Sequence, residues 1–294
     1  MSCVDGADAH SSAASFMGRG GRTVVGSAPF RLVKSDKVLA YRAHNQHILT
    51  GFRPDNDTSL VNALFRLHGQ SFNIWSHLAG TIIFVIPRIV LDPSIAGAPW
   101  MSLALRLHAA IGAGCGLASA VYHVCESWPT QTYSQTLALD YTMAYVATVS
   151  HSCLIAAYET SGHPYLCASL MLPLVALGIK GSLFFFGSQS KSNTTDPRHK
   201  VFLTMFMPFL VTVPIIGRAL IYPNPLTEVL LRWLLAFVAC CSSWLLLLPE
   251  RFFPPGTFDI VGNSHNVMHV MVLVVWRELH LGIRGLVETY AAQA

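Results

Sequence analysis

The chain contains, at residues 226–248, the stretch LTEVLLRWLLAFVACCSSWLLLL. Apart from Glu228 and Arg232 near its start, this stretch holds almost only apolar and small side chains. The hydrocarbon core of a bilayer is crossed by a helix of roughly 20 predominantly apolar residues. The stretch therefore predicts a transmembrane helix.

Six further segments have a similar length and composition, and short polar or proline-containing joints separate them. They are residues 73–91, 101–124, 136–158, 164–186, 201–222 and 264–283. Of the 294 residues, 52% are hydrophobic and 12% are charged, whereas soluble domains carry about 25% charged residues. We therefore expect an all-α polytopic membrane protein with seven transmembrane helices, whose membrane domain covers residues 67–284.

The positive charges are concentrated near the N-terminus. Eight of the 19 Lys and Arg residues precede residue 67, namely Arg19, Arg22, Arg31, Lys34, Lys37, Arg42, Arg53 and Arg66. Because Lys and Arg accumulate on the cytoplasmic side of membrane proteins, residues 1–66 are predicted to be a cytoplasmic segment and residues 285–294 an outer C-terminal tail. Residues 1–30 are rich in Ser, Ala and Gly and are expected to be disordered. A basic patch can also indicate nucleic-acid binding, but this one adjoins apolar helices, so no nucleic-acid partner is expected.

Ionisable residues inside the predicted helices are candidate functional residues, because inserting each one costs about 2.5–3.5 kcal/mol. The second helix ends with Ser119 and His123, the third begins near Asp140, and the seventh begins with His265 and His269. In a chain that crosses the membrane alternately, these three helix ends share one face, which the charge distribution makes cytoplasmic. The five side chains are therefore expected to meet at a similar depth.

This set of side chains suits a metal ion. His265 and His269 are four residues apart, so both rings project from one helical face, and zinc binds His nitrogens at about 2.0–2.1 Å. A third ligand from His123 would leave a fourth position for water, which Asp140 could hold or deprotonate. Ser119, one turn before His123, could hydrogen-bond that water or a reacting carbonyl.

Two other interpretations of the membrane histidines remain. A single histidine in a membrane helix more often hydrogen-bonds a neighbouring helix than binds a metal, and this is the expectation for His77, His108 and His151. Haem held by two histidines normally needs them on facing helices. His265 and His269 share one helical face, so haem is disfavoured.

Several short motifs occur in order at the ends of the predicted helices. They are Phe72-Asn-Ile-Trp-Ser-His77-Leu-Ala-Gly80, Ser119-Ala-Val-Tyr-His123, Leu139-Asp140-Tyr141, the stretch from Leu248 to Ile260, and Gly262-Asn-Ser-His265-Asn-Val-Met-His269. With these motifs the chain resembles the progestin and adipoQ receptor family, which is related to the haemolysin III proteins, over about residues 40–283. The resemblance implies seven helices with a cytoplasmic N-terminus.

The resemblance also implies a zinc ion bound by His123, His265 and His269. Asp140 would orient the zinc water and Ser119 would complete the site. Members of the family are described as receptors for protein hormones or steroids, and some are linked to hydrolysis of the ceramide amide bond. The implied partners are therefore a membrane lipid such as ceramide or a sterol, and an extracellular protein or steroid ligand.

Several positions depart from the family pattern. Gln70 stands where the family usually has Glu, Met143 where it has Gly, and Asn266 where it has Gln; the pair Arg277-Glu278 in the last helix is also unusual. None of these changes removes a proposed ligand. They bear on whether the site hydrolyses a lipid amide.

Three functions are compatible with these features. The first is a membrane receptor with zinc-dependent amide hydrolase activity, and the second is a non-enzymatic receptor in which zinc ties the helices together. A transporter or channel would need polar groups across the whole membrane, and it is disfavoured because the proposed cluster lies at one face only.

Overall fold

The computed structural model describes residues 31–43, 45–188 and 198–293 of the chain. The disorder expected for residues 1–30 falls outside the described residues. In the described part the secondary structure is helical, and the only strand-like pairing is an isolated bridge between Val33 and Phe52. The all-α prediction is confirmed for this part of the chain.

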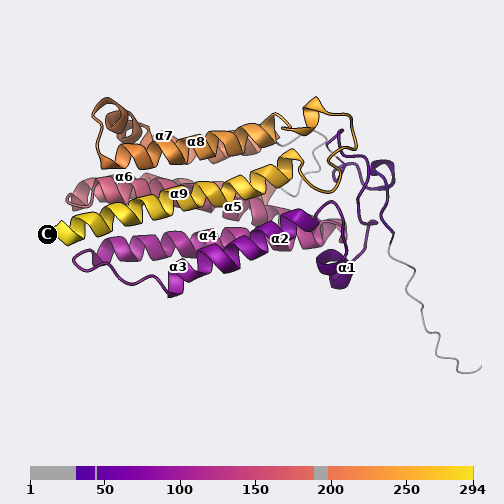
Figure 1. Cartoon of the computed structure of the whole chain (residues 1–294), viewed down its shortest axis with the longest axis horizontal. Helices are drawn as coiled ribbons and strands as arrows, with labels where there is room; N and C mark the ends of the chain where they lie inside the picture. Colours follow the sequence, from indigo (N-terminus) through magenta and orange to yellow (C-terminus); the bar gives the residue numbers. More distant parts are fainter. Residues whose placement is uncertain (1–30, 44, 189–197, 294) are drawn as a thin grey trace, which may run out of the picture. The chain divides into compact units, whose positions relative to one another are not determined.

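The described residues form seven long helical segments at the positions of the seven predicted helices, and these segments lie alongside one another (Figure 1). The first is a composite of α2 (Ser71–Gly80), the π-helical η2 (Thr81–Val85) and α3 (Ile86–Val90). The others are α4 (Pro99–Cys125), α5 (Thr130–Glu159), α6 (Pro164–Ser188), α7 (Arg198–Ile221), α8 (Pro225–Leu245) and α9 (Ser264–Gln293). Short helices α1 (Leu60–Phe65), η1 (Ser35–Lys37) and η3 (Glu250–Phe252) lie in the connections. Helix α9 continues without a break through residues 285–293, the segment expected as the outer tail.

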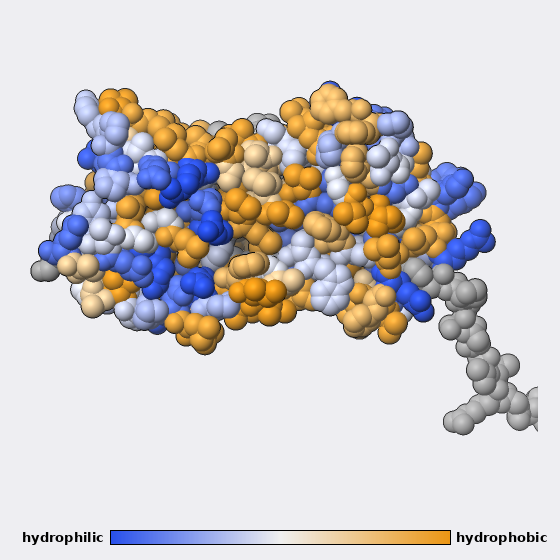
Figure 2. Space-filling view, in the orientation of Figure 1, coloured by the Kyte–Doolittle hydropathy of each residue, from blue (hydrophilic) through white to orange (hydrophobic). Residues whose placement is uncertain are grey.

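Four of the described helices are long and apolar enough to cross a membrane: Ser71–Val90, α4, Tyr165–Phe185 within α6, and α8. Helices α5 and α9 have 30 residues each and are more polar, because they carry many of the Ser, Thr and His side chains that the bundle buries. In the face shown in Figure 2, hydrophobic residues predominate across the middle of the helices. Hydrophilic residues gather at the end where α9 finishes.

Glycines allow two pairs of helices to approach closely. A Cβ atom on Gly116 of α4 would meet Thr81, and one on Gly282 of α9 would meet Val229 of α8. Small residues at helix contacts bring backbones together in membrane proteins. Both positions therefore fix the distance between neighbouring helices.

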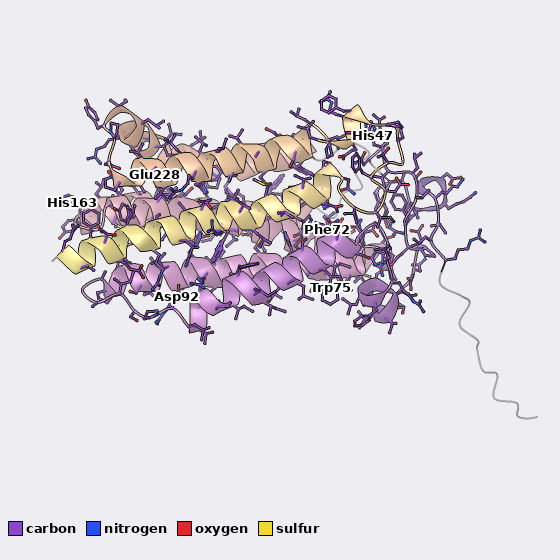
Figure 3. The ribbon with its side chains drawn as sticks, in the orientation of Figure 1. His47, Phe72, Trp75, Asp92, His163 and Glu228 are labelled. Atoms are coloured by element: carbon purple, nitrogen blue, oxygen red, sulfur yellow. The ribbon has the colours of Figure 1, made fainter. Side chains whose placement is uncertain are left out.

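One end of the bundle is covered by polar connections. Asp259, in the connection before α9, accepts hydrogen bonds from the backbone N–H groups of Leu49 (2.8 Å) and Thr50 (2.9 Å). We call this end, where α4 finishes and α9 begins, the capped end, and the opposite end, where α9 finishes, the distal end. Figure 3 shows His47 towards the capped end and His163 towards the distal end.

Candidate metal centre

The first turn of α9 is fixed by side-chain caps. Asn263 accepts a hydrogen bond from the backbone N–H of Asn266 (3.1 Å), and Glu250 accepts one from the N–H of Ser264 (2.6 Å). The first N–H groups of a helix have no intrahelical partner, and a carboxylate there also suits the helix dipole. These contacts hold the turn that carries His265 and His269.

The last turn of α4 is held by two buried arginines. Arg53 donates to the carbonyl of Val124 (2.6 Å), and Arg42 donates to the carboxylate of Glu126 (2.9 and 2.7 Å). The final carbonyls of a helix lack intrahelical partners and favour a positive charge. These contacts fix the turn that carries His123.

Burial and ion pairing shift the pKa of Arg42 in opposite directions. Burial alone lowers the pKa of its guanidinium, but the hydrogen bonds and the charge of Glu126 and Asp55 more than offset this, so the pKa is raised. Burial lowers the pKa of Arg53, whose nearest acidic groups include Glu126 and Asp57. The pair Arg42–Glu126 is therefore the electrostatic anchor of the capped end.

The imidazoles of His123, His265 and His269 converge at the capped end. The Nε2 atoms are 3.0 Å apart for His123 and His269, 3.4 Å for His123 and His265, and 3.2 Å for His265 and His269. His123 and His269 are 2% and 1% exposed, and His265 is half-buried. The predicted convergence of the three histidines is thus present in the structure.

These distances match those of ligands around one tetrahedral ion. With bonds of about 2.05 Å, neighbouring ligand atoms of a tetrahedral zinc are separated by about 3.3 Å. Hydrogen bonds between the rings explain this triangle poorly. Each Nε2 is either a donor or an acceptor, so at least two of the three have the same role and cannot bond each other. A cation satisfies all three nitrogens together. The triad could therefore hold a metal ion, with a fourth position left over.

Asp140 of α5 lies close to Ser119 of α4. The Ser119 hydroxyl donates a hydrogen bond to the carboxylate of Asp140, which links α4 to α5. Ser119 is buried and lies one turn before His123 on α4. The pair therefore joins α5 to the stretch of α4 that leads to the candidate metal centre.

Two departures from the family pattern, Gln70 and Asn266, belong to one hydrogen-bonded chain. Asn73 donates to Gln70 (2.8 Å) and accepts from Asn266 (2.7 Å), which in turn accepts from the N–H of Gly262 (2.8 Å). This chain ties the start of α2 to the first turn of α9. In the sequence, both positions depart from the family pattern, but no spacing or motif predicts that Asn73 connects them.

The other departures also have partners. Met143 packs against Gly114 of α4, where a Cβ atom would lie 2.7 Å from its methyl carbon. Glu278 forms one ion pair with Arg232 of α8 (3.3 Å) and another with its neighbour Arg277. The unusual charges in α9 are thus paired at the surface of the bundle.

Comparison with known proteins identifies the family. The family profile described as haemolysin-III related matches residues 65–276, a stretch that includes all three histidines. The chain belongs to the haemolysin-III related family. Together with its apolar helices, this makes it an integral, multi-pass membrane protein.

Three similar proteins show the breadth of the haemolysin-III related family. An uncharacterised protein of Schizosaccharomyces pombe is 24% identical over 288 residues, covering 89% of this chain and 61% of that protein. The "ADIPOR-like receptor IZH2" of Saccharomyces cerevisiae is 24% identical and covers 88% of this chain and 84% of that protein. The human "membrane progestin receptor gamma" is 24% identical and covers 79% of this chain and 74% of that receptor. The chain thus spans less than two thirds of the first relative and most of the other two.

Proposed function

We propose that this chain is a seven-helix membrane receptor of the progestin and adipoQ receptor type with a zinc ion held by His123, His265 and His269. The observation that carries the proposal is the triangle of Nε2 atoms with sides of 3.0, 3.2 and 3.4 Å. Imidazole nitrogens are common zinc ligands, and three of them around one open position are typical of catalytic zinc sites.

The proposed topology has seven spans and a cytoplasmic N-terminus. Its support is the order of seven long helical segments, from the α2–α3 composite to α9, together with the Lys and Arg residues before residue 67. Basic residues next to membrane helices favour the cytoplasmic side. In this topology the capped end, and with it the metal centre, faces the cytoplasm.

The proposed reaction is hydrolysis of a lipid amide such as ceramide. A bound zinc ion would lower the pKa of a water molecule and polarise the amide carbonyl. Asp140 takes a proton from the attacking water as its oxygen bonds to the carbonyl carbon, and returns it to the amine nitrogen when the C–N bond breaks. Ser119 donates its one hydroxyl proton to the Asp140 carboxylate before the reaction, and to the developing oxyanion once Asp140 has taken a proton from the water.

A ligand from outside the membrane is part of the same proposal. One relative is named a membrane progestin receptor and another an ADIPOR-like receptor. By analogy with these relatives, we propose that the ligand of this chain is a steroid or an extracellular protein. A lipid or sterol would reach the helices directly through the apolar surface that they present.

The second candidate is a receptor in which zinc is structural. It is favoured by the small internal space near the centre, a cavity of about 30 Å³ lined by His77, Cys115, Gly116 and other residues. That volume holds about one water molecule. A lipid substrate would require the helices to separate, whereas a structural ion would not.

Metal analysis of the purified full-length protein tests the ligand set. The double variant with His265→Ala and His269→Ala should lose its zinc, because only His123 of the triad remains. His163→Ala is the matched control, because His163 is an exposed histidine at the far end of the bundle (Figure 3). Unchanged zinc content in the double variant would show that the ion is held elsewhere.

Fatty-acid release from a panel of ceramides tests the reaction. At equal zinc occupancy, Asp140→Asn should abolish release while the metal content stays the same. Release that depends on zinc in the wild type and is lost in this variant supports hydrolysis. Absence of turnover from every ceramide, with zinc fully bound, would favour the structural role.

A further inference from the structure

A second histidine cluster lies deeper in the bundle than the metal centre. His108 of α4 faces His280 of α9 with 3.1 Å between their Nδ1 atoms, and its Nε2 is 2.8 Å from Nδ1 of His151 on α5. All three side chains are buried, with exposed fractions of 2%, 1% and 7%. His280 is eleven residues beyond His269 on α9, or about 16 Å along the helix axis.

The arrangement of this cluster differs from that of a metal site. His108 directs its two ring nitrogens to two different histidines, so the three rings form a line. A single ion binds one nitrogen of each imidazole. Among the described residues, the histidines whose ligand atoms converge on one point are His123, His265 and His269.

A line of imidazoles is suited to moving protons. A neutral imidazole accepts a proton on one nitrogen and carries a proton on the other. When a proton binds to one nitrogen, the proton on the other nitrogen is released to the next ring. The positive charge therefore moves from ring to ring although the rings stay in place. His108, which is bonded through both nitrogens, occupies the middle of such a line.

Trp276 stacks on two of the three imidazole rings. Its indole stacks on His108 with ring planes 10° apart and on His280 with planes 17° apart. The face of an aromatic ring attracts a cation. The indole therefore stabilises the imidazolium that forms when either ring carries an extra proton.

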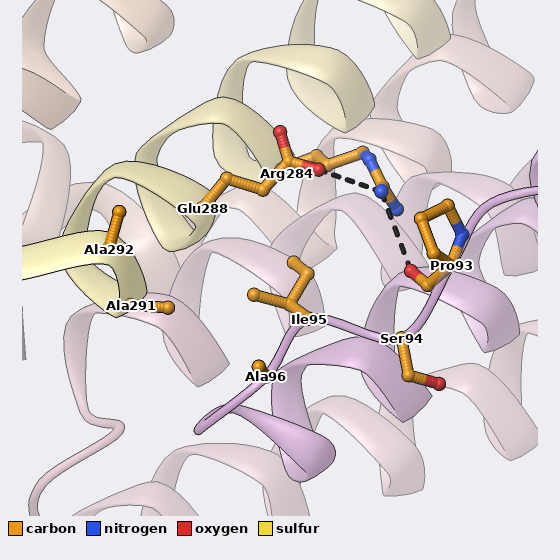
Figure 4. A pocket seen from close by; sticks show the side chains of 8 residues that line it. All are labelled: Pro93, Ser94, Ile95, Ala96, Arg284, Glu288, Ala291 and Ala292. Carbon is orange, nitrogen blue, oxygen red and sulfur yellow. Dashed lines mark hydrogen bonds and ion pairs between the residues drawn. The ribbon is translucent and has the colours of Figure 1, made fainter.

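The distal end of the line leads towards the surface. Nε2 of His280 is buried without a hydrogen-bond partner. One turn further along α9, Arg284 pairs with Asp92 (3.1 Å) and Glu288 (2.7 Å) and lines a pocket of about 290 Å³ (Figure 4). Arg88 also pairs with Asp92 on this side of the bundle. The residue with the unpartnered nitrogen thus lies one helical turn from Arg284, which lines a charged pocket.

The inner end of the line reaches a cavity beside the metal centre. His151 lines the cavity of about 30 Å³ together with His77, Gly112 and Trp276. This volume suffices for one water molecule. Both ring nitrogens of His77 are buried without partners, and its ring lies 4.0 Å from that of His269. The cavity therefore sits between the histidine line and the metal ligands.

We propose that His280, His108 and His151 form a proton-transfer chain through the bundle. A proton enters at Nε2 of His280, passes from its Nδ1 to Nδ1 of His108, and then from Nε2 of His108 to Nδ1 of His151. His151 delivers it to water in the cavity, from which the polar side chains of the capped end lead to the other membrane face. No electrons are transferred, and each imidazole gains one proton and loses one.

Proton flux into liposomes tests the proposal. The full-length protein is reconstituted with a pH-sensitive dye inside the vesicles, and a potassium gradient with valinomycin drives protons inwards. Wild type should acidify the lumen faster than protein-free vesicles, and His108→Gln and His280→Gln should each lose this flux. His163→Gln, on an exposed histidine outside the line, should retain it.

Two results of this experiment would overturn the proposal. Wild-type vesicles that acidify no faster than protein-free vesicles would show that the cluster only joins helices. Full flux in both glutamine variants, with each protein eluting and melting as the wild type does, would place any conduction elsewhere. His280→Gln lies at the end of the line, so it keeps the test valid if His108→Gln fails to fold.

Discussion

Asn266 donates a hydrogen bond of 2.7 Å from its side-chain amide to the side-chain oxygen of Asn73. Both residues are almost fully buried, with exposed fractions of 1% and 2%. Asn266 directly follows His265, while Asn73 lies in the first turn of α2, so the bond couples the N-terminal segment of the bundle to a proposed metal ligand. The groups around metal ligands set ligand orientation and with it metal affinity.

The first prediction is that Asn73→Leu weakens metal binding although no ligand is changed. The variant leaves the buried amide of Asn266 without its acceptor, which costs about 1–3 kcal/mol. Loss of such supporting contacts lowers metal affinity by about 10–100-fold. Zinc affinity measured by competition with a chelator checks this, with Gln131→Leu on an exposed position of α5 as the control. Equal affinity in Asn73→Leu and wild type would mean that the first turn of α9 is held without this bond.

The second prediction concerns the buried pair Arg42–Glu126, whose side chains are 1% and 5% exposed. Glu126→Ala leaves the charge of Arg42 buried with Asp55 as its remaining acidic partner, and removing one partner of a buried pair costs about 3 kcal/mol or more. Thermal unfolding in detergent checks the loss of stability.

The control for this experiment is the exposed pair Lys37–Asp36, with nitrogen and oxygen 3.7 Å apart and both side chains about two-thirds exposed. Because exposed pairs contribute about 0–1 kcal/mol, Asp36→Ala should leave the melting temperature almost unchanged. Similar losses in Glu126→Ala and Asp36→Ala would contradict the anchoring role given to Arg42.

The third prediction is that metal removal destabilises the bundle only while the triad is intact. The proposed ion would tie α4 to α9 and stabilise the folded state by mass action. A strong chelator should therefore lower the melting temperature of the wild type. His123→Ala should melt at the same temperature with and without chelator, and a chelator effect that persists in this variant would place the ion at another site.

Much of this architecture could be predicted from the sequence because the signals are local. Apolar runs fix the helices, and the four-residue spacing of His265 and His269 fixes their common face. Topology alone then brings His123 to the same end of the bundle. The structure agrees with each of these steps.

Pairings between distant residues could not be predicted in this way. The expectation that membrane histidines bond neighbouring helices is confirmed for His108 and His151, which bond each other across α4 and α5. It is wrong for His77, whose two ring nitrogens are buried without a hydrogen-bond partner. His280 was not recognised as their partner, because it lies far along the chain and has no spacing in common with them. The predicted cluster of polar groups at one face disfavours transport, but the line from His280 to His151 extends the polar groups towards the distal end.

The last prediction is a loss of stability at acidic pH that depends on His68. This residue lies between α1 and α2, and burial lowers its pKa to about 4. Its Nδ1 accepts from the N–H of Gln70 (3.1 Å), and its Nε2 lies 2.9 Å from the carbonyl of Ala63, so the folded protein holds the neutral ring. An unfolded histidine has a pKa of about 6.5 and takes up a proton sooner as the pH falls.

The sign of the effect follows from this difference. The stabilisation from His68 is complete above about pH 6.5 and is lost as the pH falls towards 4, at up to about 1.4 kcal/mol per pH unit. His68→Gln should be less stable at neutral pH but should lose less stability on acidification. Melting temperatures of both proteins, stripped of metal so that ligand protonation does not contribute, are compared across this range. Parallel pH profiles for the two proteins would show that the acid sensitivity arises from other groups.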